Sequence, residues 1–94
     1  GTTLRAYNRA MDFEWDGDKS TLNLAQRGFG FDFAARIFEG PMIEWPDDRR
    51  DYGEDRIIAL GCVDGEWLVV VYTWRGEARR IISARRASRK ERPS

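Results

Sequence analysis

The chain has 94 residues, 41% of them hydrophobic and 34% charged, which is the size and composition of one globular domain and excludes a two-domain protein. It contains no histidine and a single cysteine, Cys62, so an internal disulfide is excluded and a zinc or iron centre is not expected, whereas a carboxylate-bound Mg²⁺ stays open. The single cysteine, the lack of an apolar run near the ~20 residues that span a membrane and the lack of a signal-peptide pattern at the N-terminus together predict a cytoplasmic protein.

The chain begins with a segment of unclear structure and continues into a strand. Residues 1–10 have no hydrophobic period, so we expect an N-terminal extension that precedes a single domain over residues 11–94. Phe13 and Trp15 alternate with acidic residues, and this period of two predicts a half-exposed strand over residues 11–15.

Two helices are predicted next. Asp16 or Asp18 is expected to cap the first helix, over residues 19–27, and Gly28 is expected to end it in a left-handed conformation. A second helix is predicted up to the Gly-Pro pair at residues 40–41, because apolar residues recur at helical spacing. This apolar stripe consists of Phe31, Ala34, Ala35 and Phe38.

The second half of the chain has the pattern of strands joined by turns. Strands are predicted over residues 42–45, 57–62, 67–74 and 78–85. The polar, acidic residues 47–55 are expected to form an exposed loop. Because the strand over residues 67–74 is apolar on both faces, we expect this strand to be central and covered on both sides.

The C-terminal part completes the predicted fold. A regular last strand has two faces, with Arg80, Ile82 and Ala84 on one and Arg79, Ile81, Ser83 and Arg85 on the other. Ser88 and Glu91 have the spacing of a capping box and predict a short C-terminal helix. The order of elements predicts an α+β fold, in which two helices pack on one face of an antiparallel meander sheet.

Charge is distributed unevenly although it sums to zero. Residues 39–66 carry nine acidic and three basic side chains, and residues 75–94 carry eight basic and two acidic ones. The basic end predicts a surface for an anionic partner such as RNA. The alternative is that the acidic and basic segments form ion pairs with each other and leave no basic surface for a partner.

Three motifs occur in order along residues 11–92. The first is F-x-W-D-x-x-K at residues 13–19, followed by Asn23, Gly28 and F-x-x-A at residues 31–34. The other two are E-D-R at residues 54–56, running into Leu60-Gly61, and R-I-I-S-A-R-R-A at residues 80–87, followed by Glu91. Together they resemble the BrnT-type ribonuclease toxins of bacterial type II toxin–antitoxin systems. One departure is that the Lys-His dipeptide of that family is Gln26-Arg27 here.

The resemblance implies a RelE-like fold and an RNA endonuclease that inhibits growth. It also implies a BrnA-like antitoxin with a ribbon-helix-helix domain that silences the toxin. DNA would then be bound only indirectly, through the antitoxin. Neither a cofactor nor a membrane is implied.

Cleavage of RNA without a metal requires deprotonation of the 2′-hydroxyl, stabilisation of the phosphorane and protonation of the 5′-oxygen. The fourteen arginines supply planar guanidinium groups that match phosphate oxygens. We therefore expect a metal-independent enzyme, weakened by the missing histidine, whose catalytic residues are Arg56, Arg80, Arg85 and Glu54. The expected RNA-binding residues are Arg27, Arg86 and Lys19. The guanidinium groups of the last strand are expected to converge with Arg56 on one concavity.

Several of these roles have alternatives. Glu54, Glu91 and Tyr72 are candidates for the general base, although a cluster of arginines would lower a carboxylate pKa and make a poor base. Glu91 is also a candidate helix cap, and the arginines are candidates for ion pairs with the acidic loop. The tryptophans either stack on bases or pack in the core or against a partner, and this applies to Trp45, Trp67 and Trp74.

Two other functions compete with the nuclease. A degenerate toxin that no longer cleaves RNA, and acts as an antitoxin-binding co-repressor, is favoured by the missing histidine. A non-catalytic RNA-binding module is disfavoured by the neutral net charge and by the lack of a stacking-platform motif.

Overall fold

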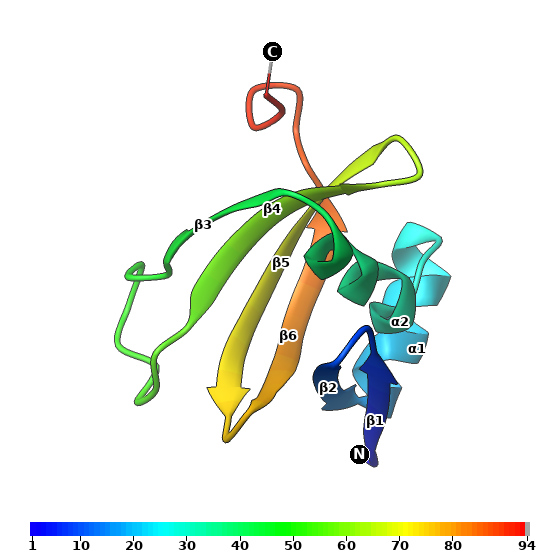
Figure 1. Cartoon of the computed structure of the whole chain (residues 1–94), viewed down its shortest axis with the longest axis vertical. Coiled ribbons are helices and arrows are strands. Elements are labelled where there is room, and N and C mark those ends of the chain that lie inside the picture. The colour runs from blue at the N-terminus through cyan, green and yellow to red at the C-terminus, as the bar shows by residue number, and fades with distance from the viewer. Residues whose placement is uncertain (94) are drawn as a thin grey trace.

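The computed structural model describes residues 1–93, in which one six-stranded sheet carries helices on one of its faces (Figure 1). The strands are β1 (Thr3–Asn8), β2 (Met11–Asp16), β3 (Met42–Pro46), β4 (Ile57–Val63), β5 (Glu66–Arg75) and β6 (Ala78–Arg86). The helices are α1 (Gly17–Arg27), α2 (Phe31–Ala34) and the 3₁₀ helix η1 (Ala35–Glu39). The α+β class with helices on one face is confirmed.

The sheet is mixed, so the prediction of a purely antiparallel meander is wrong. The strand order is β1-β2-β6-β5-β4-β3, and β2 and β6 run parallel whereas the other neighbours run antiparallel. The helices carry the chain from β2 to β3 at the far edge, and successive antiparallel pairings then bring β6 back beside β2. The hydrophobic period of a segment does not specify which distant strand it pairs with. The parallel pairing of β2 and β6 therefore could not be predicted from the sequence.

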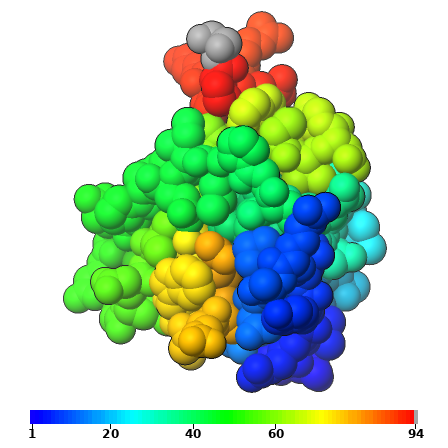
Figure 2. Space-filling view, viewed as in Figure 1, coloured from blue at the N-terminus to red at the C-terminus, as the bar shows by residue number. Residues whose placement is uncertain are grey.

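Strand β1 lies in the segment for which no period is visible. It forms a hairpin with β2 through Arg9 and Ala10, which both have positive φ angles. Its large apolar residues Leu4 and Tyr7 are exposed, so the strand has no buried face that would produce an alternating pattern. In the space-filling view, β1 is part of the outer surface, beside the start of β6 (Figure 2).

The two ends of α1 follow the sequence prediction. The Asp16 side chain accepts a hydrogen bond from the Asp18 backbone N–H at 2.9 Å, and Gly28 ends the helix with φ 86°. Buried Asn23 donates from Nδ2 to the Phe29 carbonyl at 2.9 Å and so holds the helix against the following loop. The predicted second helix is present, but it continues from α2 into the tighter η1.

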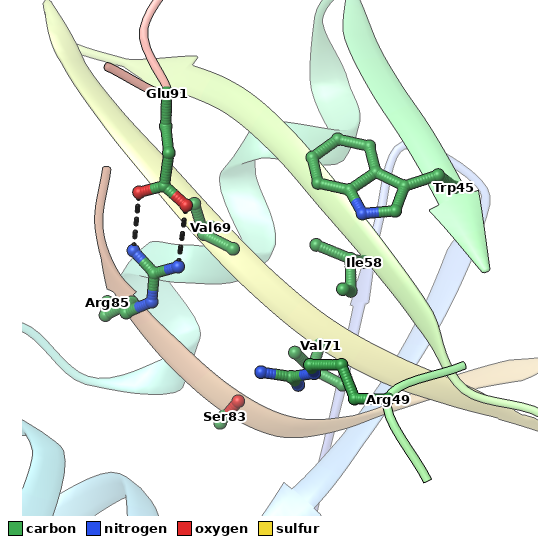
Figure 3. A pocket seen from close by; sticks show the side chains of 8 residues that line it. All are labelled: Trp45, Arg49, Ile58, Val69, Val71, Ser83, Arg85 and Glu91. Carbon is green, nitrogen blue, oxygen red and sulfur yellow. Dashed lines mark hydrogen bonds and ion pairs between the residues drawn. The ribbon is translucent and has the colours of Figure 1, made fainter. Parts of the chain in front are cut away.

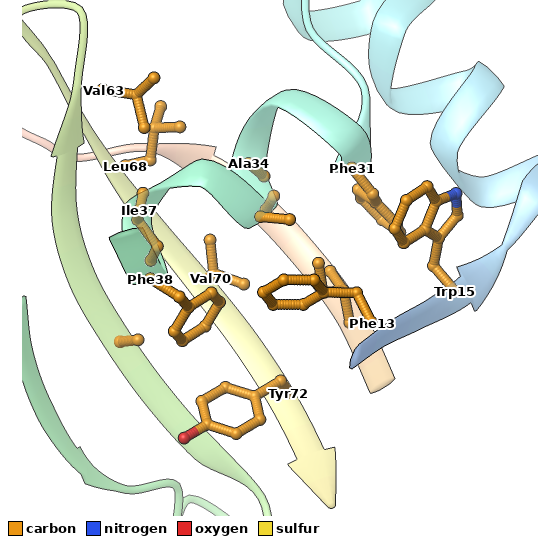
Figure 4. Close-up of a cluster of buried hydrophobic side chains, with 14 of the residues drawn as sticks. Phe13, Trp15, Phe31, Ala34, Ile37, Phe38, Val63, Leu68, Val70 and Tyr72 are labelled. Carbon is orange, nitrogen blue, oxygen red and sulfur yellow. The ribbon is translucent and has the colours of Figure 1, made fainter. Parts of the chain in front are cut away.

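The main core lies between the helices and the sheet (Figure 4). Its aromatic rings are in direct contact, with centroids 5.6 Å apart for Phe13 and Phe38 and 5.1 Å apart for Phe38 and Tyr72. Helix η1 lies so close to β4 that a Cβ added at Gly61 would be 2.8 Å from the Cβ of Ile37. The absence of a side chain at Gly61 therefore allows this close packing.

Strand β5 is central and buried on both sides, as predicted. Its alternate residues contribute to two clusters, of which the second lies on the sheet face away from the helices, called here the open face. This second cluster is smaller, and its buried members are all aliphatic: Ile58, Leu60, Val69, Val71 and Ala87.

A β-bulge interrupts β6, so the predicted division of its residues between two faces is wrong. Val71 pairs with Ser83, whereas the next residue, Tyr72, pairs with Ile81, which leaves Ile82 as the extra residue. A bulge shifts the alternation of side chains by one position. Relative to the residues before Ile82, the residues after it therefore lie on the opposite faces from those in a regular strand, so Arg80, Ser83 and Arg85 share one face.

The predicted C-terminal helix is absent, because residues 87–93 form only a turn. Half of the expected capping box is nevertheless present: Glu91 Oε1 accepts from the Ser88 backbone N–H at 2.7 Å, and the Glu91 N–H donates to the Ser88 carbonyl at 3.1 Å. A single turn is too short to be a stable helix. Within the described part of the chain, no helix is long and apolar enough to cross a membrane.

Candidate functional site

A hollow of about 250 Å³ lies on the open face, between the end of β3 and the C-terminal turn (Figure 3). Its floor consists of the aliphatic residues Ile58, Val69 and Val71. The remaining lining residues bring polar, charged and aromatic groups to the rim, and they are Trp45, Arg49, Ser83, Arg85 and Glu91. The hollow thus combines an apolar floor with two guanidinium groups.

Arg85 is held in the hollow by Glu91. Its Nη1 and Nη2 donate to the two carboxylate oxygens of Glu91, each at 2.7 Å. The hydrogen bonds from Arg85, followed by the one from the Ser88 N–H, lower the pKa of Glu91 to about 2. While this pair persists, Glu91 is a poor base and orients the guanidinium.

Arg49 is held by Asp47 in a similar way. Its Nε and Nη2 donate to the two oxygens of Asp47 at 2.7 and 2.8 Å, and these hydrogen bonds lower the pKa of that carboxyl to about 2. The Asp47 side chain is fully buried, whereas that of Arg49 is 65% exposed. The bond from the Asp47 N–H to the Arg56 carbonyl, 2.8 Å, ties this part of the loop to the start of β4.

The two guanidinium groups influence each other. Hydrogen bonding to Glu91 raises the pKa of Arg85, while burial and the positive charge of Arg49 act in the opposite direction. Figure 3 shows Arg49 extending over the floor toward Ser83, with Arg85 beyond it. Sequence reasoning missed Arg49, because an arginine inside an acidic loop gives no signal that it turns toward the sheet.

Arg80 lies on the same open face as Arg85, as a result of the bulge between them. Its Nη1 donates to Glu14 Oε1 at 3.1 Å, and Arg5 approaches the other oxygen of this buried carboxylate at 3.5 Å. Arg80 does not line the hollow. It lies beside β2 and extends the charged surface of the open face toward β2 and β1.

Arg56 and Glu54 lie elsewhere, and the predicted convergence of Arg56 with the last strand is wrong. Both residues line a second hollow of about 460 Å³, enclosed by the acidic loop. Arg56 Nε donates to Glu54 Oε2 at 3.1 Å, and its guanidinium lies 4.0 Å from the ring centroid of Tyr52. Glu54 also pairs with Arg75, at 3.4 Å. This loop therefore forms its own network of ion pairs, separate from Arg85.

The predicted RNA-binding residues lie on the side of the sheet that carries the helices. Arg86 pairs with Glu66 at 3.3 Å, donates to the Arg27 carbonyl and lies 5.2 Å from the ring centroid of Phe29. Lys19 is exposed on α1. None of these groups lines the hollow on the open face.

Tyr72, a candidate base, is also on the helix side. Its hydroxyl donates to Glu44, and burial, followed by that hydrogen bond, raises its pKa to about 12. Its ring lies within the main core beneath η1. A tyrosine with a raised pKa on the opposite face does not serve the hollow.

Among residues 1–93, no group of three or more Asp, Glu or Cys side chains is placed to hold a metal ion. The charged groups at the hollow are instead guanidinium forks, each oriented by a carboxylate. The molecule is thus a small α+β protein whose open sheet face carries two such forks above an apolar floor, and planar guanidinium forks have the geometry that matches carboxylate and phosphate oxygens.

Comparison with protein families gives this class a specific identity. Residues 15–91 match the family described as the ribonuclease toxin BrnT of type II toxin–antitoxin systems, and the chain belongs to this family. The resemblance inferred from the three sequence motifs is thereby confirmed. Membership makes the chain a ribonuclease toxin by family, with RNA as target and an antitoxin as partner. No curated protein matches the chain.

Proposed function

We propose that the chain is a metal-independent RNA endonuclease whose active site is the hollow on the open face. The observation that carries this proposal is the placement of Arg49 and Arg85 at one apolar-floored hollow, in a chain of a ribonuclease toxin family. Guanidinium forks bind phosphate oxygens in pairs and stabilise the charge that develops on a phosphorane.

The first step is an exchange of anions at Arg85. The scissile phosphate replaces the Glu91 carboxylate on the guanidinium, since the two groups offer the same pair of oxygens. Once Arg85 has turned to the phosphate, Glu91 loses the interaction that lowers its pKa most. The freed carboxylate then has a pKa nearer its ordinary value and lies beside the substrate, where it accepts the proton of the 2′-hydroxyl.

The 2′-oxygen attacks the phosphorus, and Arg85 stabilises the phosphorane. The bond to the 5′-oxygen breaks, and this oxygen takes a proton from solvent. The products are a 2′,3′-cyclic phosphate and a 5′-hydroxyl end. Arg80, farther along the same face, binds the flanking backbone in this scheme. Much of the rate enhancement comes from orientation of the RNA, because the base is weak.

We further propose a BrnA-like antitoxin with a ribbon-helix-helix domain as the partner. Support comes from the type II family, whose toxins are paired with an antitoxin. In this proposal the toxin reaches operator DNA only through the antitoxin.

A second candidate function is that of a degenerate toxin that acts as an antitoxin-binding co-repressor. The observation in its favour is that four of the five arginines predicted from the sequence are engaged with carboxylates, namely Arg56, Arg80, Arg85 and Arg86. The chain also has no histidine to serve as acid or base. In this reading the exchange at Arg85 does not occur.

Cleavage of RNA by the purified chain decides between the two candidates. Arg85→Ala is expected to reduce the rate about 100-fold, because a charge-stabilising donor of the transition state is lost. Arg36→Ala is the matched control, since Arg36 is also half-exposed and paired with a carboxylate, Asp64, but lies on η1. A folded Arg85→Ala variant with the rate of the unmodified chain would contradict the site, and an unmodified chain that cleaves no RNA would favour the co-repressor.

A further inference from the structure

Trp45 occupies an unusual position for a large aromatic residue. It lies near the end of the edge strand β3, opposite Ile58, and its side chain remains 40% exposed. Figure 3 shows the indole standing over Ile58, across the hollow from Arg85 and Glu91. In the part of the chain that the structure describes, no other ring or guanidinium packs against this indole, whereas Trp74 meets Tyr72 edge to face and has the Arg79 guanidinium over its ring.

Arg49 lines the same hollow as Trp45 and Arg85 and retains capacity to bind an anion. Asp47 engages only its Nε and Nη2, so the N–H groups of Nη1 are free of this pair. The buried carboxylate of Asp47 fixes the guanidinium plane, and the largely exposed Arg49 side chain lines the hollow. A phosphate that binds there meets an oriented donor and loses little to side-chain ordering.

The size of the hollow limits what it holds. Its volume of about 250 Å³ is below the ~300–1,000 Å³ of pockets that enclose drug-sized ligands. It therefore accepts about one nucleotide, with its base and phosphate, at a time. Bases in a duplex are stacked on their neighbours, so only an unstacked base of a single strand is able to reach an aromatic side chain.

We propose that Trp45 and Arg49 form a nucleotide subsite for single-stranded RNA, in which a base stacks on the indole and an adjoining phosphate binds Arg49. This subsite rests on the proposed function, because that function places the cleaved bond at Arg85. The Trp45 indole is then the group that selects the nucleotide next to that bond. Stacking accepts every base but favours larger ring systems, so the subsite gives a modest preference for purines.

The test measures RNA affinity separately from cleavage. The probe is a fluorescein-labelled single-stranded 2′-O-methyl oligonucleotide, which lacks the attacking hydroxyl, and binding is followed by fluorescence anisotropy. Trp45→Leu is expected to weaken binding about tenfold, because stacking on the aromatic ring is lost. Trp45→Phe keeps a ring and is expected to retain most of the affinity. Trp74→Leu, which removes a comparably exposed tryptophan on the helix side, is expected to leave affinity unchanged.

The same variants in the cleavage assay separate the two proposals. If the unmodified chain cleaves RNA, and Trp45→Leu binds the probe and selects cleavage positions as the unmodified chain does, the subsite is wrong while the nuclease stands. If the unmodified chain binds the probe without cleaving RNA, and Trp45→Leu weakens that binding, the subsite stands and the nuclease is wrong. A folded unmodified chain that neither binds the probe nor cleaves RNA overturns both.

Discussion

The two faces of the sheet use the same strands for different purposes. On the helix side, β5 contributes Val70 and Tyr72 to a core of large aromatic side chains. On the open face, its residues Val69 and Val71 join a small aliphatic cluster that forms the floor of a hollow. The period of two in a strand thus divides the residues between the main core on one side and the floor of the hollow on the other.

The arginines of β6 show the same division. Arg79, on the helix side, lies 4.6 Å from the ring centroids of both Phe38 and Trp74, which shield it from solvent. Arg85, on the open face, is 43% exposed and held chiefly by a carboxylate that is itself solvent-accessible, with one longer hydrogen bond to the Arg86 carbonyl at 3.3 Å. A stacked guanidinium is fixed in place, whereas one in a half-exposed ion pair is able to exchange its partner for a phosphate.

The largest expected effect tests the contribution of the helix side to stability. Phe38→Ala removes a ring that contacts Phe13, Tyr72 and Arg79, and is expected to lower the free energy of unfolding by about 3–5 kcal/mol. Ile58→Val, on the floor of the hollow, is expected to lower it by only about 0.5–1.5 kcal/mol. Urea unfolding of both variants measures the two values. Equal losses would contradict the assignment of stability chiefly to the helix side.

A smaller effect on the free energy of unfolding is expected when a carboxylate that orients one of the two guanidinium groups is removed. Asp47 and Glu91 have ordinary pKa values of 3.8 and 4.5, and both pKa values are lowered to about 2 in the folded chain. Because the folded pKa is the lower one, each pair stabilises the fold above about pH 4.5, and this contribution is lost as the pH falls toward 2. Asp47→Asn is therefore expected to lower stability at pH 7 and to flatten its decline between pH 4.5 and 2.

Urea unfolding as a function of pH checks this expectation. Asp48→Asn removes the same charge from an exposed neighbouring position and tests for the effect of charge alone. A decline between pH 4.5 and 2 that is as steep in Asp47→Asn as in the unmodified chain would show that the Asp47–Arg49 pair does not hold the loop.

Features set by neighbouring residues could be predicted from the sequence. The Asp16 cap, the Gly28 terminus and the central position of β5 depend on local hydrogen bonding or on an unbroken apolar run. The candidate arginine at the hollow, Arg85, was also predicted, because it belongs to a motif of the family.

Features set by distant contacts could not be predicted. The bulge at Ile82 depends on the register between β5 and β6, and it alone places Arg80 and Arg85 on one face. The orientation of Arg49 depends on the burial of Asp47 beneath the loop, and the route of Arg56 into its own network depends on Glu54 and Tyr52. Pairings of this kind leave no period in the sequence. The set of residues that line the hollow could therefore be identified only from the structure.

The central claim is that RNA binds the open face and not the helix side. The indole N–H signals of Trp45 and Trp74 report on the two faces directly in a ¹H–¹⁵N spectrum, and substitution of each by Phe assigns them. On titration with the 2′-O-methyl oligonucleotide, the Trp45 signal is expected to shift and that of Trp74 to stay in place. A shift of the Trp74 signal with an unmoved Trp45 signal would contradict the account.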